Sequence, residues 1–576
     1  MLIKQLIDLY KQLEENGEVK LGWNTSATLH YGIDISDDGK VMQIIPFVTD
    51  KKPKVVVAPG TITKETGATD FDKFLYGTAR YFIGYDKTGN RKASFEHTKT
   101  YHDTLLKNAD SKEAIAIKKY FEYYLKNRDE LLNLFDFEKN KDYFSSNFCL
   151  CYRGIPLTEN EEMKSIWETE FNRKLNAASD KKAISLVSGE YGAIAKTHGT
   201  VSVPGGTNPS LISFNAESFE SYNMSQSYNS SITVKESIMY ASALNYMLKR
   251  DDYHVSLGDS TLVMWTANAN PEYSAIAMNI MGMFQKEKSN ISQQDILKIA
   301  NDVRMGRKIE VDEKAFDNSE PFYIASLTPN GGRVKLDFYY ETSFGDLISN
   351  IAKHYERLEL ENAQSSSLTP YQILQETVFD AKKLNHNLQE NLLLSILKNT
   401  YYPSAIYSSV LNRIIKERNI LFSKEGVTKF RRKMQITKAY LLQNTNSEKE
   451  VLEVGLNKET KSVAYQCGRL FAVLEKIQRD ATGAENMGEK HFASAMITPA
   501  NALTKCLRLS QYYMRKLQTP AKIMYNNLIQ EITGKIDDFP KHNFQIAQGE
   551  FCLGYYHQKQ ELWRKKSDNK EENING

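Results

Sequence analysis

The sequence of 576 residues has few cysteines, and none of them forms a CxxC pair. The five cysteines therefore predict neither a disulfide framework nor a cysteine-rich zinc site. Cys149 and Cys151 stand two residues apart in the run FCLCY, where a strand would place both side chains on one face. We interpret all five as buried free thiols of a protein in a reducing compartment.

Long apolar runs are also lacking. The longest, such as residues 238–248, are too short and too interrupted to span a membrane. The first 17 residues place apolar side chains at helical spacing with charges between them, which predicts an amphipathic helix ending at Gly17 rather than a signal peptide. We therefore expect a cytoplasmic protein without membrane contact.

The familiar catalytic motifs are missing. There is no GxxxxGK[ST] phosphate loop, no GxGxxG after a strand, no HExxH and no GxSxG elbow. His97 and His102 lie close together without a cysteine pair, so packing or surface roles are expected for them. These absences argue against a hydrolase or an NTPase, although distant residues could still assemble an active site. We predict no catalytic residue, no metal site and no cofactor.

An excess of one charge is lacking as well. The chain has 74 Lys and Arg against 71 Asp and Glu, a net charge of +3. A protein coated by nucleic acid would be far more basic, so any nucleic-acid contact should be local. Residues 454–576 hold 18 Lys and Arg against 13 Asp and Glu, which makes this part more basic than the part before it.

What is present is an ordinary globular composition. Hydrophobic residues make up 41% of the chain and charged residues 25%, which excludes a largely disordered chain. Residues 1–345 mix strands and helices. Their patterns predict a hairpin over 30–48 that turns at 37–40, a helix over 111–135 with a Ser cap, and a half-buried strand over 332–341.

Helices follow one another from residue 346 onward, and a charged segment at 446–461 marks a further boundary. The fold class is therefore α+β. We predict a mixed α/β domain over 1–345, a helical domain over 346–453, and a C-terminal helical bundle over 454–576 that ends in a disordered polar tail. The predicted helices of the middle domain are 346–361, 370–383, 388–398, 403–418 and 427–443.

The segment 185–234 is unusually rich in Ser, Asn, Thr and Gly, and it places Lys196 and His198 before the Gly-rich turn VPGGTNP. Long polar loops are often functional, and small residues let backbone approach a ligand closely. Asn and Ser side chains can also touch base edges or phosphates without bulk. A surface loop closed by Asn and Ser turns explains the composition equally well.

Several long blocks follow one another in a recognisable order. The run SFNAESFESYN (213–223) precedes IMYASALNYML (238–248) and LGDSTLVMW (257–265). Later blocks are FYYETSFGDLISNIAKHYERLEL (338–360), GRLFAVLEKIQRDATG (468–483), HFASAMITPANALTKCLRLSQYYMRKL (491–517) and QGEFCLGYYHQ (548–558), and the GW pair at 22–23 and VSGEYGAIAKTHG (187–199) agree with them. This series resembles the large subunit of the type I-C CRISPR surveillance complex (Cascade) over nearly the whole chain.

One segment, 63–85, departs from the family pattern. Where the family tends to show Pro-Asn and Asp-Asn pairs, this chain has Asp72-Lys73 and Gly77-Thr78. Family contacts made by those polar residues cannot be carried over to this segment.

The resemblance implies a subunit without catalytic activity. In this family the large subunit recognises the protospacer-adjacent motif (PAM) in double-stranded target DNA, helps to start R-loop formation, and works with a separate nuclease-helicase that is recruited to cut. The implied partners are the guide RNA with backbone and RNA-end-binding CRISPR subunits, and a small subunit. That subunit can arise by internal initiation from the same gene, here near Val454 or Met434.

Such a protein needs few base contacts, because pairing with the guide supplies most of the sequence recognition. We choose the candidate contacts in the first domain by composition rather than by a family motif. They are lysines that follow a predicted strand or flank the segment 63–85, and polar residues of segment 185–234. The candidate PAM contacts are Lys51, Lys52, Lys54, Lys64, Lys73, Lys196, His198, Asn208 and Asn215.

A second candidate surface lies on the helix that Thr498 and Pro499 are predicted to start. Cations and one tyrosine fall on one face of it, which suits the backbone of a single strand with occasional base stacking. A solvated face opposite a core stripe explains the pattern equally well. The candidate single-strand contacts are Lys505, Arg508, Tyr512 and Arg515, together with Arg469, Lys476 and Arg479 on the preceding helix.

Two other functions remain open. A CRISPR RNA-processing endonuclease could use His198 with Lys196 as acid and base, although Glu190 is the only carboxylate nearby in sequence. Cleavage of repeat RNA that His198→Ala abolishes would favour this alternative. A pure scaffold would instead make target binding indifferent to the PAM.

Overall fold

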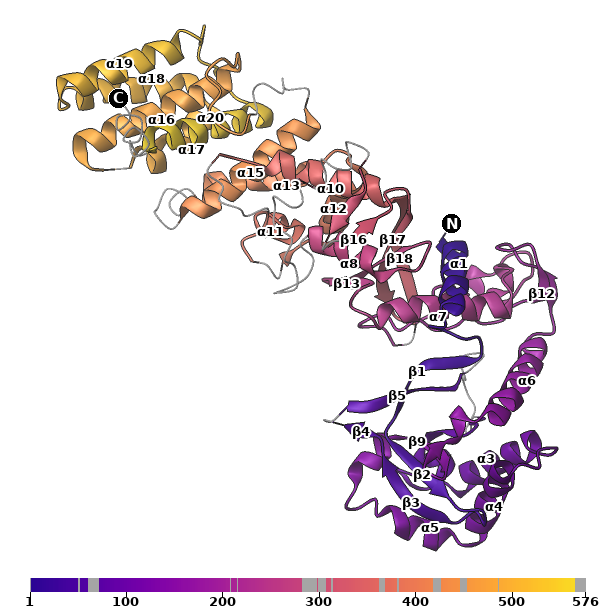
Figure 1. Cartoon of the computed structure of the whole chain (residues 1–576). Helices are drawn as coiled ribbons and strands as arrows, with labels where there is room; N and C mark the ends of the chain where they lie inside the picture. The colour runs from indigo at the N-terminus through magenta and orange to yellow at the C-terminus, as the bar shows by residue number, and fades with distance from the viewer. Residues whose placement is uncertain are drawn as a thin grey trace. The chain divides into compact units, whose positions relative to one another are not determined.

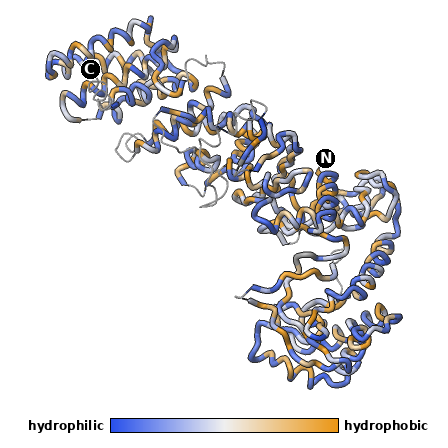
Figure 2. Tube along the Cα trace, viewed as in Figure 1, coloured by the Kyte–Doolittle hydropathy of each residue, from blue (hydrophilic) through white to orange (hydrophobic). Residues whose placement is uncertain are grey.

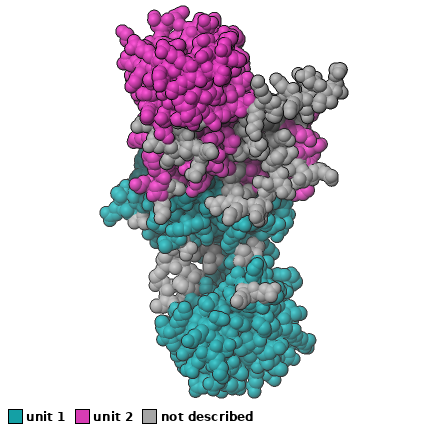
Figure 3. All heavy atoms as spheres, turned by 90° about the vertical axis from the view of Figure 1, so that its left-hand side faces the viewer, with its two compact units in different colours: residues 1–271, 323–340 teal, residues 272–322, 341–576 magenta. Residues whose placement is uncertain are grey.

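In the computed structural model (Figure 1), the chain divides into two compact units (Figure 3). Unit 1 comprises residues 1–271 and 323–340, and unit 2 comprises residues 272–322 and 341–576. The division into domains 1–345, 346–453 and 454–576 stays a prediction. The structure describes residues 2–49, 52–60, 72–207, 209–214, 216–281, 298, 307–311, 314–361, 368–380, 383–417, 426–445, 453–484 and 486–564. The predicted disordered tail, residues 565–576, lies outside these residues.

The predicted α+β class is confirmed. Strands and helices are mixed up to β18 (Arg333–Ser343), and every element described beyond it is a helix. Within the described ranges, no helix is long and apolar enough to cross a membrane. Figure 2 shows hydrophilic and hydrophobic residues interleaved along the helices. All five cysteines are free and buried, as the sequence analysis expected.

The first core of unit 1 packs helices against a mixed five-stranded sheet. Its strand order is β10-β9-β2-β3, and β6 also pairs with β9. β2 and β3 form the predicted hairpin, with Gly39 at φ 76° in the turn, and β2 runs parallel to β9. The strands are β2 (Tyr31–Ile35), β3 (Val41–Pro46), β6 (Tyr76–Thr78), β9 (Asn147–Tyr152) and β10 (Ile155–Pro156).

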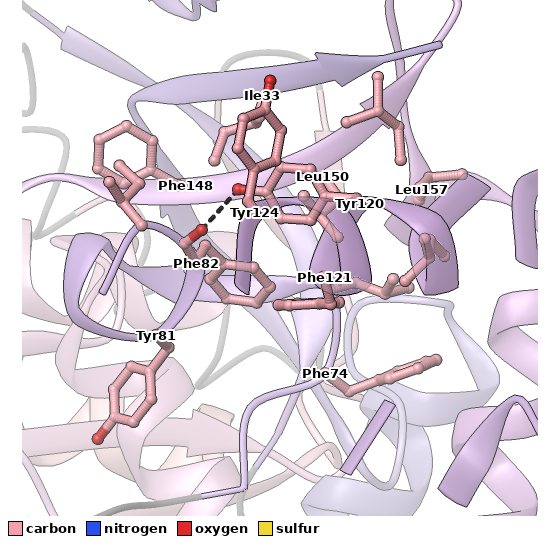
Figure 4. Packing of buried hydrophobic residues seen from close by; sticks show 14 of the residues in the cluster. Ile33, Phe74, Tyr81, Phe82, Tyr120, Phe121, Tyr124, Phe148, Leu150 and Leu157 are labelled. Carbon is pink, nitrogen blue, oxygen red and sulfur yellow. Dashed lines mark hydrogen bonds between the residues drawn. The ribbon is translucent and has the colours of Figure 1, made fainter. Parts of the chain in front are cut away.

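Helix α4 (Lys112–Lys126) provides much of the aromatic core of this part (Figure 4). Tyr120, Phe121 and Tyr124 lie on its buried face, because side chains three and four positions apart share one side of a helix. Tyr120 donates a hydrogen bond of 2.6 Å to the carbonyl of Phe82 (Figure 4). Each fully buried aromatic side chain of this kind contributes about 2–3 kcal/mol to folding.

The helix expected over 111–135 is correct at its start and wrong in its length. Ser111 caps it by accepting a 3.2 Å hydrogen bond from the amide of Ala114. Asn127 leaves the helical region at φ −114° and ψ 53°, so α4 ends and α5 (Arg128–Phe135) begins. Neighbouring elements of this core are α2 (Ala79–Phe82), β7 (Tyr85–Asp86), β8 (Gly89–Asn90), α3 (Lys92–Leu105) and α6 (Glu161–Ala177).

A separate three-stranded sheet has the order β1-β5-β4. It comprises β1 (Trp23–Leu29), β4 (Val48–Thr49) and β5 (Lys52–Pro59). Alternate residues of β1 and β5, such as Leu29 and Val56, join Cys149 of β9 in a small apolar cluster. The paired strands therefore have one buried side, while Val55 and Val57 on β5 are exposed.

The second core of unit 1 joins α1 (Leu2–Glu15) and α7 (Val234–Leu248) to the sheet β13-β14-β17-β18. Along β18, Val334 and Phe338 are buried as predicted, but Leu336 is 39% exposed. Asp337 is buried instead, because hydroxyl groups such as Thr328 Oγ1 at 2.5 Å satisfy its carboxylate. The other elements are β11 (Lys182–Ile184), β12 (Tyr191–Ala193), β13 (His254–Leu257), β14 (Ser260–Thr266) and β17 (Pro321–Asn330).

Unit 2 begins with α8 (Pro271–Ile280), β15 (Ile309–Val311) and β16 (Lys314–Phe316) and continues as helices. The predicted helices of the middle region are present, with α11 shorter than expected. They are α10 (Phe344–Leu358), α11 (Pro370–Gln375), α12 (His386–Lys398), α13 (Ser404–Lys416) and α15 (Val427–Asn444).

A bundle of five helices forms the end of unit 2. Its two longest helices are in close backbone contact: a Cβ on Gly468 would lie 2.0 Å from the carbonyl oxygen of Phe551, and a Cβ on Gly554 would lie 2.1 Å from that of Tyr465. Glycine is therefore required at this crossing. The helices are α16 (Val463–Thr482), α17 (Met487–Ile497), α18 (Pro499–Met514), α19 (Thr519–Thr533) and α20 (Gln545–Trp563).

Candidate nucleic-acid interface

A groove of about 780 Å³ lies within unit 1. Its walls come from the start of β1, the segment before β6, and helices α6 and α7. We call it the Trp23 groove. Its aromatic lining includes Trp23, Phe74, Tyr76, Tyr81 and Tyr246, and its cations are Lys20, Lys73, Lys249 and Arg250.

The backbone of Gly22, the residue before Trp23, is constrained. Gly22 has φ +85°, and a Cβ there would lie 2.8 Å from the ring of Phe171. The Gly22 carbonyl accepts hydrogen bonds from Trp167 Nε1 at 2.7 Å and from the Gly60 amide at 2.9 Å. Trp23 therefore starts from a rigid backbone, and only glycine suits the position before it.

Three aromatic rings of the groove each have a cation beside them. Lys20 Nζ lies 5.8 Å from the centre of the Trp23 ring, and Lys73 Nζ lies 6.0 Å from that of Tyr81. The guanidinium of Arg250 is 5.1 Å from the Tyr246 ring. A cation next to an aromatic face is the combination that binds the phosphate and base of a nucleotide.

The two carboxylates of the groove, Asp72 and Glu18, are both engaged. Asp72 accepts from Lys174 Nζ at 2.7 Å and lies 3.0 Å from His97 Nε2. Burial opposes the effect of these contacts, but the Lys174 and His97 interactions still hold the pKa of Asp72 below its usual range. Glu18 accepts a 3.1 Å hydrogen bond from the hydroxyl of Tyr246. Neither acid is therefore an isolated negative charge.

The predicted PAM residues lie in different places. Lys73 lines the Trp23 groove, whereas Lys52 and Lys54 are exposed on β5 and Lys196 is exposed after β12. Lys54 also forms a 3.4 Å ion pair with Glu159. Lys51, Lys64, Asn208 and Asn215 lie outside the described residues.

His198 is in the core rather than on a surface. It is 2% exposed, and its Nδ1 lies 2.8 Å from the hydroxyl of Tyr240. Burial lowers the pKa of His198 to about 4, so the ring is neutral near pH 7. The expectation that it contacts DNA is therefore corrected: the side chain supports α7 from within.

The second predicted surface is present on α18. Lys505, Arg508, Tyr512 and Arg515 are all exposed, while Leu503, Cys506, Ser510 and Met514 are buried on the other side. Lys516 Nζ lies 4.9 Å from the centre of the Tyr512 ring. We call the exposed residues Lys505, Arg508, Tyr512 and Arg515 the α18 stripe.

The candidates on α16 do not extend the α18 stripe. Arg469 is completely buried, and it donates hydrogen bonds of 2.9 Å to Gln466, Gln558 and Glu531. Lys476 pairs with Asp480, and both Lys476 and Arg479 lie beside the ring of Trp563, at 5.3 and 5.2 Å. The expectation that Arg469 contacts nucleic acid is corrected, because its guanidinium holds α16, α19 and α20 together.

Within the part of the chain that the structure describes, no group of three or more His, Cys, Asp and Glu side chains could hold a metal ion. His102, which the sequence places near His97, is buried, and burial lowers its pKa to about 4. Its Nε2 accepts a 3.1 Å hydrogen bond from the amide of Leu75. This histidine orders the backbone that leads into β6.

Four of the groove residues were not among the contacts predicted from sequence: Lys20, Trp23, Lys249 and Arg250. They are far apart in sequence, so no local pattern connects them. The only signal was the GW pair at 22–23, which belongs to the resemblance described above.

Comparison with known proteins bears on the whole chain. No curated protein matches it. The model of one protein family does match, and it spans residues 6–563. Both units lie almost entirely within this match. The chain therefore belongs to the family described as CRISPR-associated protein (Cas_Csd1).

Proposed function

We propose that this chain is the large subunit of a type I-C CRISPR surveillance complex, and that it recognises the PAM in duplex DNA and helps to start the R-loop. The family match over residues 6–563 supports a role in a CRISPR effector complex. The order of the resembling sequence blocks supports the large-subunit assignment.

The α18 stripe is the observation that carries the nucleic-acid part of this proposal. Three cations and a tyrosine are exposed on one side of a helix whose other side is buried in the bundle. Cations at this spacing can follow the phosphates of a single strand, and the tyrosine can stack on a base. In the assembled complex this surface would hold the DNA strand that is displaced or about to pair.

Unit 1 would contact the duplex through its exposed lysines. Lys52 and Lys54 on β5 and Lys196 after β12 are exposed, and Lys73 lines the Trp23 groove. A few base contacts at about 1–3 kcal/mol each suffice to distinguish one short motif from another. Exchange of DNA duplex for heteroduplex is nearly balanced in energy, so modest protein contacts can determine where it begins.

The buried state of His198 weighs against the endonuclease alternative. An acid–base pair with Lys196 requires a histidine that reaches the substrate and changes its charge near pH 7. His198 is 2% exposed, and burial lowers its pKa to about 4. We therefore propose that cleavage belongs to a separate nuclease-helicase, recruited once the target is unwound.

Partners would include the guide RNA, the backbone and RNA-end-binding subunits, and a small subunit made from an internal start. Val454 precedes α16, so a chain that starts there contains all five helices of the bundle. Met434 is buried in the middle of α15, so a start there would begin with half a helix. Of the two starts, Val454 gives the better-formed product.

The test measures binding of the assembled complex to duplexes with an intact or an altered PAM. The variant Lys52→Ala/Lys54→Ala/Lys73→Ala/Lys196→Ala should lose most of its preference for the intact PAM. The control Lys126→Ala/Lys139→Ala removes lysines whose side chains are 74% and 83% exposed elsewhere in unit 1, and it should keep the preference. An unchanged preference in the quadruple variant would contradict this assignment of the contacts.

A further inference from the structure

The Trp23 groove has a size that suits a small planar ligand rather than a double helix. Its volume of about 780 Å³ is within the range of small-molecule sites, which are commonly 300–1,000 Å³. One or two nucleotides are ligands of this size. A duplex could touch the rim of such a groove but could not enter it.

Trp23 is prepared to stack on a base. The bonds to the Gly22 carbonyl fix the backbone that precedes it, and the residue is partly exposed at the groove. A base that stacks on the indole would therefore meet a surface already in place.

The charges of the groove favour a phosphate. Lys20 and Lys73 stand beside aromatic rings, and the acid Asp72 is engaged by Lys174. Arg250 is paired with Asp252 at 3.2 Å and lies 3.8 Å from Glu18, so these three charges offset one another. Lys20 itself pairs with Glu168 outside the groove lining, at 2.5 Å. Trp23 is partly exposed and therefore offers a stacking face with positive charge next to it, as in binding sites for single strands, whereas Tyr81 is only 6% exposed.

We propose that the Trp23 groove binds an unstacked nucleotide of a single-stranded nucleic acid, with its base on Trp23 and its phosphate near Lys20 and Lys73. The inference rests on the proposed function, because strand separation next to the PAM would supply unpaired nucleotides. It adds a second single-strand site to the α18 stripe, in the other unit of the chain.

The experiment uses the full chain and a short thymidine oligonucleotide that carries one 5-iododeoxyuridine. Ultraviolet cross-linking followed by peptide mapping identifies the residues that touch the base. Affinity is measured in the background Lys505→Gln/Arg508→Gln/Arg515→Gln, which removes the cations of the α18 stripe. Thymidine monophosphate serves as the competitor that distinguishes a free nucleotide from a strand.

Four variants then test the groove. Trp23→Ala should weaken binding between about 5- and 150-fold, the loss expected when one stacked base loses its aromatic partner. Trp23→Phe should retain most of the affinity. Ser242→Trp fills the groove from α7 without removing Trp23, and it should weaken binding to a similar degree. The control Tyr401→Ala removes a 74% exposed aromatic from unit 2 and should have no effect.

Cross-links to Trp23 or Tyr81 that Ser242→Trp abolishes are the expected result. Three results would overturn the inference. They are cross-links confined to α18, an affinity for the oligonucleotide that Ser242→Trp leaves unchanged, and the absence of any cross-link. If thymidine monophosphate displaces the bound oligonucleotide as effectively, per nucleotide, as unlabelled oligonucleotide does, the assignment of the groove to a nucleic-acid strand is overturned. PAM preference of the assembled complex is read separately on duplexes, so the proposed function can stand when this inference fails.

Discussion

Three histidines in this protein share one environment. Each is buried with its Nδ1 between 2.6 and 2.8 Å from a tyrosine hydroxyl, and each has an Nε2 without a partner among the described residues. Burial lowers the pKa of His198 to about 4, and those of His354 and His557 to about 3. The pairs are His198–Tyr240, His354–Tyr402 and His557–Tyr465.

These histidines predict how stability depends on pH. Their rings are neutral in the folded protein, whereas in the unfolded chain they take up a proton below the ordinary pKa of about 6.5. The unfolded state therefore binds more protons between about pH 6.5 and 4, and the free energy of unfolding falls as pH is lowered through this window. Each histidine contributes at most about 1.4 kcal/mol per pH unit.

Urea unfolding at pH 7.0, 5.5 and 4.5 measures this effect. The variant His354→Gln cannot take up that proton, so its stability should fall less steeply over the same range. If the free energy of unfolding falls with pH as steeply in the variant as in the parent protein, His354 does not contribute to the pH dependence, which contradicts this assignment.

At the scale of the element, the sequence predicted most helices correctly, and it placed the residues of the α18 stripe on one exposed face, while their contact with nucleic acid stays a prediction. The α18 stripe was predictable because helical period alone separates its cations from the buried Leu503 and Met514. Arg469 has the same local pattern but meets Gln558 and Glu531, which distant helices bring to it. The break at Asn127 was missed because a single Asn is tolerated inside many helices, and only packing decides whether one ends there.

The Trp23 groove could not be predicted from sequence for a related reason. Its residues come from segments near positions 20, 73 and 250, and only the fold brings them together. Similarly, no pattern indicated that His198 lies beneath α7 rather than on the polar segment's surface. The spacing of apolar residues shows which face of a single helix or strand is buried. A site made from several elements depends on how those elements pack, which the spacing does not show.

The crossing of α16 and α20 gives a prediction about stability. Gly554→Ala should destabilise unit 2 by on the order of 3 kcal/mol, because the new Cβ would lie 2.1 Å from the carbonyl oxygen of Tyr465 and the helices would have to separate. Thermal unfolding of the Gly554→Ala variant and of the parent protein measures the difference in stability. Gly332→Ala is the control, since its Cβ would have nothing within 4 Å. Equal destabilisation by both changes would contradict the account of this crossing.

The α18 stripe gives a prediction about salt. Binding of single-stranded DNA by the full chain should weaken as salt rises, and Lys505→Gln/Arg508→Gln/Arg515→Gln should make the slope of log K against log salt shallower by about 2. Fluorescence anisotropy between 50 and 200 mM salt measures the slope. The control Lys92→Ala/Lys126→Ala/Lys139→Ala removes as many exposed cations from unit 1. A slope that only the control changes would exclude the α18 stripe as the binding surface.

At the scale of the whole molecule, the core of the bundle α16–α20 comes mostly from its own helices, although Phe430 of α15 also packs against Phe492 and Tyr555. Phe471, Phe492, Phe551 and Tyr555 pack together with ring centres 4.9 to 6.1 Å apart, and all come from this bundle. We expect a chain of residues 454–576 to fold alone, with helical circular dichroism and a cooperative thermal transition. A gradual transition would show that the bundle needs the helices before it, and would count against an internal start at Val454.

The central claim is that this chain enables the complex to find a PAM and open the DNA beside it. The most direct test compares complexes assembled with and without the chain on duplexes that carry an intact or an altered PAM. Permanganate reactivity of thymines next to the PAM reports strand opening. The account predicts opening only with the chain present and the PAM intact; normal opening in a complex that lacks the chain would contradict it.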